Sequence, residues 1–172
     1  MSDKIAIAHY MSPIGLVEIH SSDNKITALF FCNDSHNDDQ IGSELLKKCI
    51  SQLDEYFKGE RIIFDLPLYQ EGTEFQQKVW NALLDIPFGN TATYADIAQK
   101  IGNSKAVRAV GTTNGKNQLW LVVPCHRIIG SDGSLTGYAG GIERKKWLLD
   151  HEARISRKLG LTIHQSIQLE LF

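Results

Sequence analysis

Residues 119–129 read LWLVVPCHRII. Five apolar residues come first, and a proline ends the run, so this stretch predicts a buried strand that stops at Pro124. Cys125 and His126 follow directly, which places a thiol and an imidazole together at the end of a rigid element. A cysteine with an ordinary pKa of roughly 8.5 is mostly protonated at neutral pH and needs a nearby base or cation to become a nucleophile. The stretch therefore predicts a reaction centre at Cys125, with His126 as the group that orients or deprotonates it.

Composition limits the class of protein. The chain has 172 residues, 42% of them apolar and only four of them prolines, which is enough for one core or for a small domain beside a larger one. The three cysteines, Cys32, Cys49 and Cys125, are irregularly spaced and form no disulfide framework. The first apolar run is too short for a signal peptide, and no stretch has membrane length. We expect reduced thiols in a cytoplasmic protein that does not associate with membranes.

The first 70 residues predict a small α+β domain. Three β-rich runs separated by turn residues are typical of an antiparallel meander. The runs are Ile5–Tyr10, Leu16–His20 and Ile26–Phe31. Apolar residues then recur every three to four positions from Ile41 to Phe57, which predicts an amphipathic helix on the sheet. Cys32 ends a strand and Cys49 lies on the buried helix face, so both are interpreted as small core residues.

Residues 71–155 predict a second, mainly helical domain. Thr73 and Gln76 form a capping box for a helix that ends near residues 86–89. Two short helices follow at 94–101, capped by Thr93, and at 105–113, capped by Ser104, and their spacing predicts a helix-turn-helix. The second of these helices is rich in small residues, so it could lie close to a groove with Lys105 and Arg108 outward. Packing against neighbouring helices explains the same composition equally well.

The end of the chain contains a glycine-rich loop, a helix and an extension. The loop at 136–141 could approach a flat ligand closely, and the helix at 142–153 presents Glu152 near its end. Residues 156–172 predict a loosely docked extension. Residues 71–155 carry ten basic and eight acidic side chains, against six and eleven in residues 1–70, so a polyanionic partner would bind the middle segment.

Cys125, His126 and Glu152 could together form a catalytic set for cysteine chemistry. On an extended strand, Cys125 and His126 would point to opposite faces, so a bridging water is the natural link between them. Glu152 is a candidate for orienting the imidazole. Such a set also occurs by chance in a chain of this size, and a purely structural cysteine remains an alternative at this point.

Several motifs together resemble one family. Residues 124–129 (PCHRII), 137–141 (GYAGG) and 146–152 (KWLLDHE), preceded by residues 105–111 (KAVRAVG), are similar to the O6-alkylguanine-DNA alkyltransferases. The resemblance covers about residues 72–153. It implies DNA repair by irreversible transfer of an alkyl group from guanine O6, and also thymine O4, to Cys125, once per molecule and without a cofactor. It also implies a ribonuclease H-like remnant as the N-terminal fold.

The resemblance assigns roles to individual residues. His126 would be a water-mediated base held by Glu152, and Asn117 would hold the active-site turn. Tyr94 would protonate guanine N3 or crowd the 3′ phosphate, and Arg108 would fill the gap left by the flipped base. Further DNA contacts in the minor groove are implied for Lys105, Ala106 and Thr112. The pocket for the base is implied for Trp120, Pro124, Ile128, Tyr138, Ala139 and Gly140.

Two expectations concern ligands and partners. Some relatives hold zinc in the N-terminal domain, but Cys32, Cys49, His9, His20 and His36 follow no known ligand spacing, so we expect no metal. The terminal residues Gln168, Leu169, Leu171 and Phe172 resemble a pentapeptide with which bacterial DNA-processing proteins dock on the sliding clamp. An apolar tail packed on the domain is the alternative. No feature implies an oligomer, so we expect a monomer.

Two other functions compete with alkyl transfer. A cysteine hydrolase using Cys125, His126 and Glu152 would turn over and would need an oxyanion hole, for which the sequence gives no signal. A transcriptional regulator built on the helix-turn-helix at 94–113 would bind specific bases and would not need Cys125. The number of matching motifs favours the alkyltransferase over both.

Overall fold

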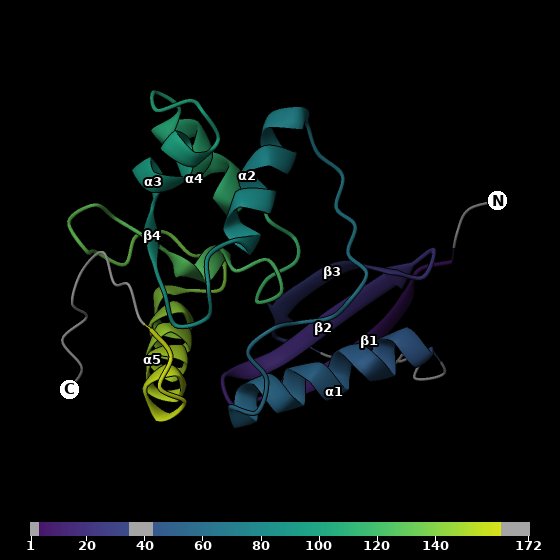
Figure 1. Cartoon of the computed structure of the whole chain (residues 1–172). Helices are drawn as coiled ribbons and strands as arrows, with labels where there is room; N and C mark the ends of the chain where they lie inside the picture. The colour runs from purple at the N-terminus through teal and green to yellow at the C-terminus, as the bar shows by residue number, and fades with distance from the viewer. Residues whose placement is uncertain (1–3, 35–42, 163–172) are drawn as a thin grey trace. The chain divides into compact units, whose positions relative to one another are not determined.

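The computed structural model describes residues 4–34 and 43–162, and its chain divides into two compact units (Figure 1). Unit 1 comprises Met1–Glu71 and Gln118–Val122, and unit 2 comprises Gly72–Asn117 and Val123–Phe172. An antiparallel sheet in unit 1 and predominantly helical structure in unit 2 confirm the predicted α+β class. Within the described residues, no helix combines the length and apolar character needed to span a membrane.

Unit 1 is built on a three-stranded antiparallel sheet in the order β1-β2-β3. Its strands are β1 (Ala6–Ser12), β2 (Gly15–Ser22) and β3 (Lys25–Cys32). Asp23 and Asn24 join β2 to β3 with φ of 49° and 57°. This left-handed conformation matches the twist of a hairpin, and aspartate and asparagine adopt it more readily than most residues. The predicted meander is therefore confirmed.

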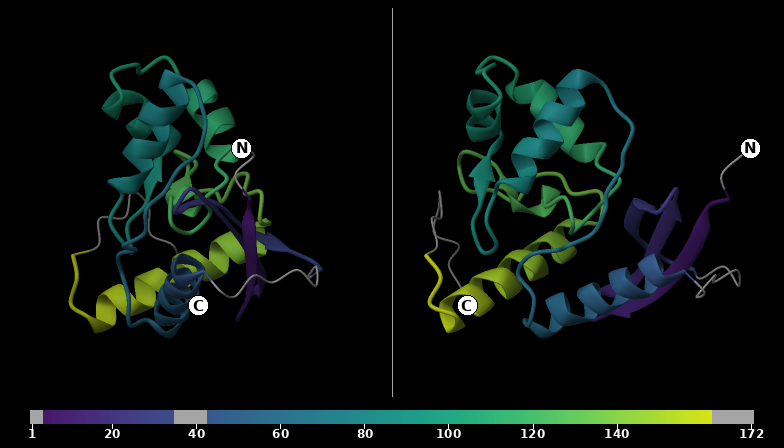
Figure 2. Two further views of the ribbon diagram at one scale, coloured as in Figure 1. Left: turned by 90° about the vertical axis from the view of Figure 1, so that its right-hand side faces the viewer. Right: turned by 45° about the vertical axis from the view of Figure 1, so that its right-hand side comes forward.

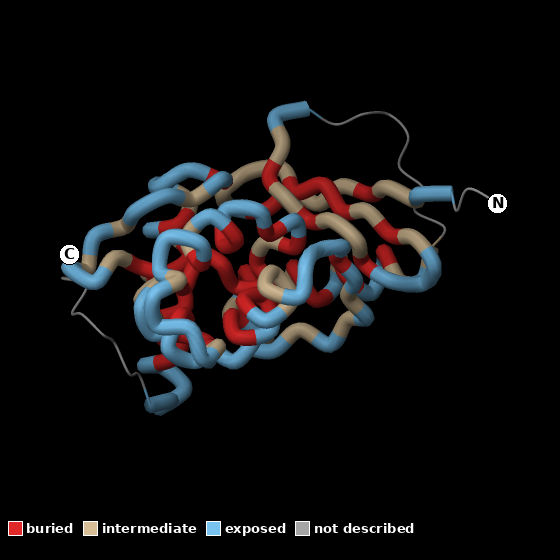
Figure 3. Tube along the Cα trace, turned by 90° about the horizontal axis from the view of Figure 1, so that it is seen from above, coloured by how far each residue is buried: buried red, intermediate tan, exposed pale blue. Residues whose placement is uncertain are grey.

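Helix α1 (Glu44–Lys58) covers one face of this sheet (Figure 2). Tyr10 on β1 donates a hydrogen bond to Asp54 of α1 at 3.3 Å, and its ring stacks on Phe57 at 6.1 Å between centroids. Ser43 caps the helix, so it begins at Glu44, three residues after Ile41, which lies outside the described residues. Successive residues on a strand point to opposite faces, so the residues adjacent to Tyr10 point away from α1. From Leu29 to Cys32 of β3, buried residues alternate with partly exposed ones. Figure 3 marks the buried, intermediate and exposed residues along the described chain.

The outer edge of β3 is paired with segments from far along the chain. The Leu29 amide donates to the Gln118 carbonyl at 2.8 Å, and the Trp120 amide donates to the Leu29 carbonyl at 2.9 Å. Pro67 and Tyr69 pair in the same way with Ile26. Residues 118–122 thus belong to unit 1 even though they interrupt unit 2 in the sequence.

The strand predicted for residues 119–123 is wrong. Only Leu119 forms a bridge, Leu121 has φ of 68°, and the Val122 amide bonds to the Trp120 carbonyl two residues earlier. The side chains other than that of Trp120 are buried as expected, with Leu119 and Leu121 both 1% exposed. A short apolar run predicts that its side chains are buried, but it does not determine the conformation of the backbone. Here the chain turns sharply and passes from unit 1 to unit 2 after Val122.

Unit 2 begins with helix α2 (Glu74–Leu84), and both halves of the predicted capping box, Thr73 and Gln76, are formed. Helices α3 (Tyr94–Lys100) and α4 (Val107–Gly115) follow and pack on each other and on α2. The indole nitrogen of Trp80 on α2 donates to the Thr113 carbonyl of α4 at 3.2 Å. A short parallel pair, β4 (Ala92–Thr93) with β5 (Ile128–Ile129), lies beside them. The predicted pair of short helices is therefore present.

Two helix boundaries differ from the prediction. Ser104 does not cap α4, because residues 103–106 form a turn closed by a hydrogen bond from the Ala106 amide to the Asn103 carbonyl. The helix runs on to Gly115, two residues further than expected. Helix α5 (Ile142–Lys158) also extends beyond the expected end near residue 153. Ile155 and Ser156 are buried, so the apolar face continues for another turn.

Gly89 allows this extra turn of α5 to pack closely. Its φ is +79°, and a Cβ at this position would lie 2.0 Å from Ser156 Oγ and 3.3 Å from the Glu152 carbonyl oxygen. Glycine tolerates positive φ without the clash that other residues have, and here it also leaves room for Ser156. Gly89 therefore fixes the approach of residues 86–90 to α5.

We expect Gly89→Ala to destabilise the protein more than Gly102→Ala, measured as the free energy of unfolding in urea. Gly102 has a φ of +77° but no heavy atom within 4 Å of its would-be Cβ, so it reports backbone strain alone, about 1 kcal/mol. Gly89→Ala adds the clash with Ser156, worth a further ~1–3 kcal/mol. Equal losses for the two variants would contradict the close packing of Gly89 on α5.

Candidate active site

Cys125 begins a single 3₁₀ turn, η1 (Cys125–Arg127), which follows Pro124. The prediction of a strand end is therefore wrong here too. In a 3₁₀ helix, successive side chains are separated by about a third of a turn, so Cys125 and His126 do not point to opposite faces as they would on a strand. Cys125 is 3% exposed and His126 is fully buried.

Two asparagine side chains hold this turn from the C-terminal end of α4. The Asn117 amide nitrogen donates to the Val123 carbonyl at 2.9 Å, and the Asn114 amide nitrogen donates to the Cys125 carbonyl at 3.4 Å. Both asparagines are buried. Asn117 thus makes the kind of contact that the resemblance implied, while Asn114 was not identified from the sequence.

The carboxylate of Glu152 on α5 is fully buried and receives hydrogen bonds from three residues. His126 Nε2 lies 2.7 Å from Oε1, and Arg127 binds both oxygens, with Nε at 2.8 Å from Oε2 and the terminal nitrogen at 3.0 Å from Oε1. The Gly89 amide donates to Oε2 at 3.2 Å. Arg127 also donates to the Ile86 carbonyl at 2.7 Å and lies over the Phe88 ring. Glu152 therefore joins η1, α5 and residues 86–89.

These contacts determine the protonation states of Glu152 and His126. Burial opposes ionisation of Glu152, but the positive charge of Arg127 and the hydrogen bonds from His126 and Arg127 outweigh it, so its pKa lies well below the ordinary range. Burial lowers the pKa of His126, against the opposing effect of Glu152. Because the ionised carboxylate can only accept, His126 Nε2 is the protonated ring nitrogen and Nδ1 is the basic one. Nδ1 is buried and has no hydrogen-bond partner among the described residues.

The Cys125 thiol is held in its protonated form. Burial raises its pKa to about 11, although a hydrogen bond from Asn117 and the charge of Lys145 partly offset this. The thiol is thus far from the low pKa of a thiolate that is ionised at rest. It needs to lose its proton during the reaction, and His126 is the neighbouring residue with a free basic nitrogen.

Lys145 is a member of the site that the sequence reasoning missed. It is fully buried on α5, its Nζ donates to the Thr136 carbonyl at 3.0 Å, and burial lowers its pKa to about 8, against the effect of Cys125. Residues 145, 148, 149 and 152 recur at helical spacing, so Lys145 shares a face with Glu152. This helical spacing could have predicted that Lys145 is buried. The adjacent Arg144 and Lys146 make the segment resemble an exposed basic surface instead.

The glycine-rich loop contributes Tyr138 and Thr136. Burial raises the pKa of Tyr138 well above its ordinary value, and the nearby Cys125 adds to the shift. The Tyr94 hydroxyl on α3 donates to the Thr136 carbonyl at 3.2 Å. The structure therefore brings Tyr94, Tyr138 and Lys145 together around one loop.

The remaining predicted DNA-binding residues lie on the surface of the α3–α4 region. Lys105, Arg108 and Thr112 are exposed and Ala106 is partly exposed. The Thr112 hydroxyl donates to the Arg108 carbonyl one turn earlier, so both lie on the same side of α4. Gly111 faces the Tyr94 ring, where an added Cβ would lie 3.6 Å from the ring, at ordinary van der Waals distance.

The predicted pocket residues are divided between the two units. Pro124, Ile128 and Gly140 are buried in unit 2, and Ala139 is exposed there. Trp120 lies in unit 1, where its ring contacts Phe30 and Phe31 at 6.2 and 6.0 Å between centroids. The predicted role of Trp120 in narrowing the pocket stays a prediction.

The comparisons with known proteins match both parts of the chain. Residues 74–154 match the DNA-binding domain, and residues 5–70 the ribonuclease-like domain, of 6-O-methylguanine DNA methyltransferase. The chain belongs to this methyltransferase family. It is 47% identical to the constitutive methylated-DNA–protein-cysteine methyltransferase of Bacillus subtilis over 156 residues, which cover 86% of this chain and 94% of the relative. The predicted resemblance is confirmed.

Solved structures of the family have the same fold. The O6-methylguanine methyltransferase of Mycobacterium tuberculosis superposes with a TM-score of 0.80 at 40% identity, covering 88% of this chain and 94% of that one. The structure of the M. tuberculosis protein in complex with DNA superposes with a TM-score of 0.79 at 41% identity, covering 86% and 93%. This methyltransferase therefore shares its architecture with relatives over most of its length.

We expect Glu152→Gln to lower the free energy of unfolding by about 3–5 kcal/mol at pH 7, because it leaves Arg127 buried without its countercharge. The pKa of Glu152 is lower in the folded chain than its ordinary value near 4.5. Its contribution to stability is therefore fully present above that value and is lost as the pH falls below it. Urea titrations from pH 7 to pH 3 measure both effects.

Glu143→Gln is the matched control, since Glu143 lies on the same helix but is exposed. It should change stability by less than about 0.5 kcal/mol. If Glu152→Gln behaves like Glu143→Gln, the buried carboxylate does not have the structural importance assigned to it.

Proposed function

We propose that this methyltransferase repairs DNA by moving the methyl group of O6-methylguanine onto Cys125. The observation that carries the proposal is a buried Cys125 thiol beside a basic imidazole that is fixed by Glu152 and Arg127, in the part of the chain that matches the family's DNA-binding domain. The relatives are named for transfer from DNA to a protein cysteine, and one neighbouring structure holds DNA.

The transfer is a single displacement. The Cys125 proton passes to His126 Nδ1, through a water molecule in our proposal, and Sγ attacks the methyl carbon. The S–C bond forms as the C–O6 bond breaks, and the bonding pair stays on O6. The resulting guanine anion takes up a proton, which Tyr94 supplies at N3 in this scheme, and exchange with solvent moves that proton to N1. His126 releases the Cys125 proton to solvent, and Tyr94 regains a proton from solvent. The net change converts the thiol and O6-methylguanine into S-methylcysteine and guanine.

Access to O6 requires that the nucleotide leave the helix. Unstacking and unpairing cost a few kcal/mol, which contacts in the pocket and the side chain that fills the gap offset. Arg108 is exposed on α4 among small residues, so it can reach between bases while the helix backbone stays close to the groove. We assign to Arg108 the role of filling the gap left by the flipped base. Lys105, Ala106 and Thr112 would contact the DNA backbone from the minor groove. The minor groove distinguishes base pairs poorly, so a protein that binds there recognises little of the DNA sequence. Such binding suits a repair protein, which acts wherever a lesion occurs.

The base would bind against the glycine-rich loop. Tyr138 is close enough to Cys125 for the charge of the thiolate to influence its pKa. Pro124, Ile128, Ala139 and Gly140 complete the proposed pocket. O4-methylthymine presents the same O-methyl group on a smaller base and is a second proposed substrate.

The competing functions fit less well. A cysteine hydrolase uses a thiol that ionises readily, whereas burial raises the pKa of the Cys125 thiol to about 11. A regulator would not need a buried thiol with a fixed base. We further propose that the protein acts as a monomer in the cytoplasm.

The test uses a duplex oligonucleotide with one O6-methylguanine. We expect the intact mass of the protein to rise by one methyl group per molecule, with the label mapping to Cys125 and not to Cys32 or Cys49. Excess substrate should not raise this value. The variant Cys125→Ser should take up no methyl group while still binding the duplex. Continued turnover, or a methyl group on another residue, would refute the proposal.

The C-terminal pentapeptide is a separate proposal. Gln168, Leu169, Leu171 and Phe172 lie outside the described residues, and their sequence supports docking in a hydrophobic pocket of the sliding clamp. A pull-down with the bacterial clamp should recover the full chain and lose a chain that ends at residue 167. Restoring the terminus with Leu171 and Phe172 changed to alanine should fail to recover binding. Equal recovery of all three forms would exclude the motif.

A further inference from the structure

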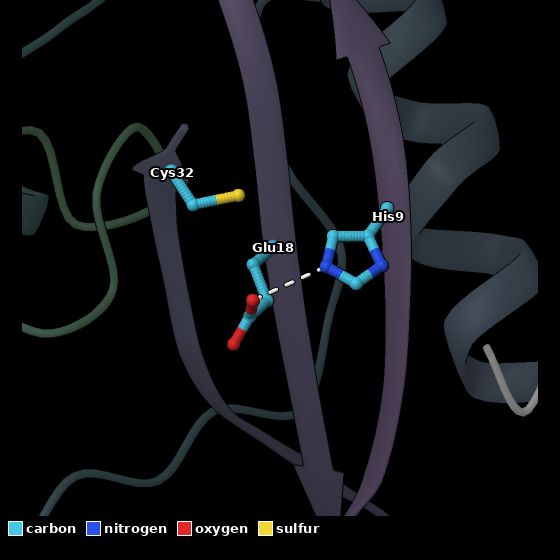
Figure 4. Close-up of side chains that lie close together, drawn as sticks. All are labelled: His9, Glu18 and Cys32. Atoms are coloured by element: carbon cyan, nitrogen blue, oxygen red, sulfur yellow. Dashed lines mark hydrogen bonds and ion pairs between the residues drawn. The ribbon is translucent and has the colours of Figure 1, made fainter. Parts of the chain in front are cut away.

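The sheet face opposite α1 gathers three side chains that commonly bind metal ions. His9 comes from β1, Glu18 from β2 and Cys32 from β3 (Figure 4). The strand register places His9 directly opposite Glu18 and pairs Cys32 with Leu16, two residues from Glu18 on the same face. One nitrogen, one carboxylate oxygen and one sulfur all lie within 4.8 Å of one another. Each strand of the sheet thus contributes one ligand atom to a single point.

The geometry is close to that of a bound zinc ion. Zinc binds nitrogen and oxygen at about 2.0–2.2 Å and sulfur at about 2.3 Å in a tetrahedron, which separates its ligand atoms by roughly 3.3–3.8 Å. His9 Nε2 and Glu18 Oε2 are already 3.1 Å apart. All three ligand atoms lie within 4.8 Å of one another, so side-chain movements of about 1 Å would complete the arrangement.

The surroundings favour a cation at this point. The His9 and Glu18 side chains are only 5% and 12% exposed, so water solvates the carboxylate poorly. His20 Nε2 binds the other oxygen, Oε1, at 2.5 Å. His20 therefore orients the carboxylate in the way that outer-shell residues orient metal ligands.

We propose that His9, Glu18 and Cys32 bind a divalent ion of the zinc class, with a water molecule as the fourth ligand. A cross-strand ion pair explains the contact of His9 with Glu18. The convergence of a thiol on the same point adds a soft ligand, and a mixed nitrogen, oxygen and sulfur set selects zinc-like ions over magnesium or calcium. The ion would link all three strands and stabilise the sheet by binding only the folded chain.

The sequence analysis predicted no metal in this domain, because His9, Glu18 and Cys32 form no local ligand motif. Residues 9, 18 and 32 are brought together only by the register of two hairpins. Cys49, which the spacing argument also considered, lies in the core side of α1 and is not part of the cluster.

The test is a titration of the full-length, reduced, metal-free chain with Co²⁺ followed by displacement with Zn²⁺. We expect one ion per chain and a thiolate-to-cobalt charge-transfer band in the near ultraviolet. Cys32→Ser should remove this band. Cys125→Ser is the matched control, because it removes a thiol outside the cluster and should leave the band intact. His9→Gln keeps every thiol and should weaken the affinity for Zn²⁺ by more than about tenfold.

Thermal melts provide a second measurement. Zn²⁺ should raise the melting temperature of the wild type and of Cys125→Ser but not of Cys32→Ser, with far-UV circular dichroism confirming that each metal-free variant is folded. If Cys32→Ser does not fold, the affinity of His9→Gln decides the question. The proposal is overturned if the wild type takes up no ion, if the cobalt band survives in Cys32→Ser, or if it disappears in Cys125→Ser.

Discussion

The buried carboxylate of Glu152 is the group on which the catalytic unit depends. It is ionised, it has no contact with solvent, and it is neutralised by Arg127 while His126 and Gly89 complete its hydrogen bonds. A buried charge is tolerated only when it is paired and fully hydrogen-bonded. The requirement therefore constrains three segments at once. The turn that carries Cys125, the segment at 86–89 and helix α5 can each lie in only one place relative to the carboxylate.

The same carboxylate determines the chemistry of the neighbouring thiol. Its contact with Nε2 of His126 leaves Nδ1 as the basic nitrogen. It does not ionise Cys125 at rest, because the pKa of the thiol stays near 11. Relative to its ordinary value, this keeps the neutral thiol favoured by about 3 kcal/mol, since each pKa unit corresponds to ~1.4 kcal/mol. A protein that reacts once has reason to keep its nucleophile protonated. A resting thiolate would be consumed by oxidants and stray electrophiles before a damaged base arrived.

The sequence predicted the elements that local chemistry controls and missed those that depend on distant contacts. The meander, the helix caps at Thr73 and Thr93, and the pairing of His126 with Glu152 all follow from periodicity, turn residues or a recognisable motif. The segment at 119–123 failed because its apolar side chains satisfy burial while the backbone turns at Leu121. Lys145 was missed because burial of a lysine depends on a carbonyl, that of Thr136, that only the folded loop supplies. The convergence of His9, Glu18 and Cys32 was likewise invisible, because strand register rather than spacing creates it.

The pairing of Leu29 with residues 118–120 has a consequence for the nascent chain. A ribosome that has released only the first 71 residues has produced all three strands and α1, but the partner for the middle of β3 is still to be synthesised. An unpaired strand edge beside Phe30 and Phe31 is a template for association with other chains. At roughly 5–20 residues per second, the interval before residue 120 emerges is several seconds. Protection of the N-terminal sheet thus depends on a segment that is translated immediately before the reactive cysteine, so a truncated message yields an exposed edge and no repair activity.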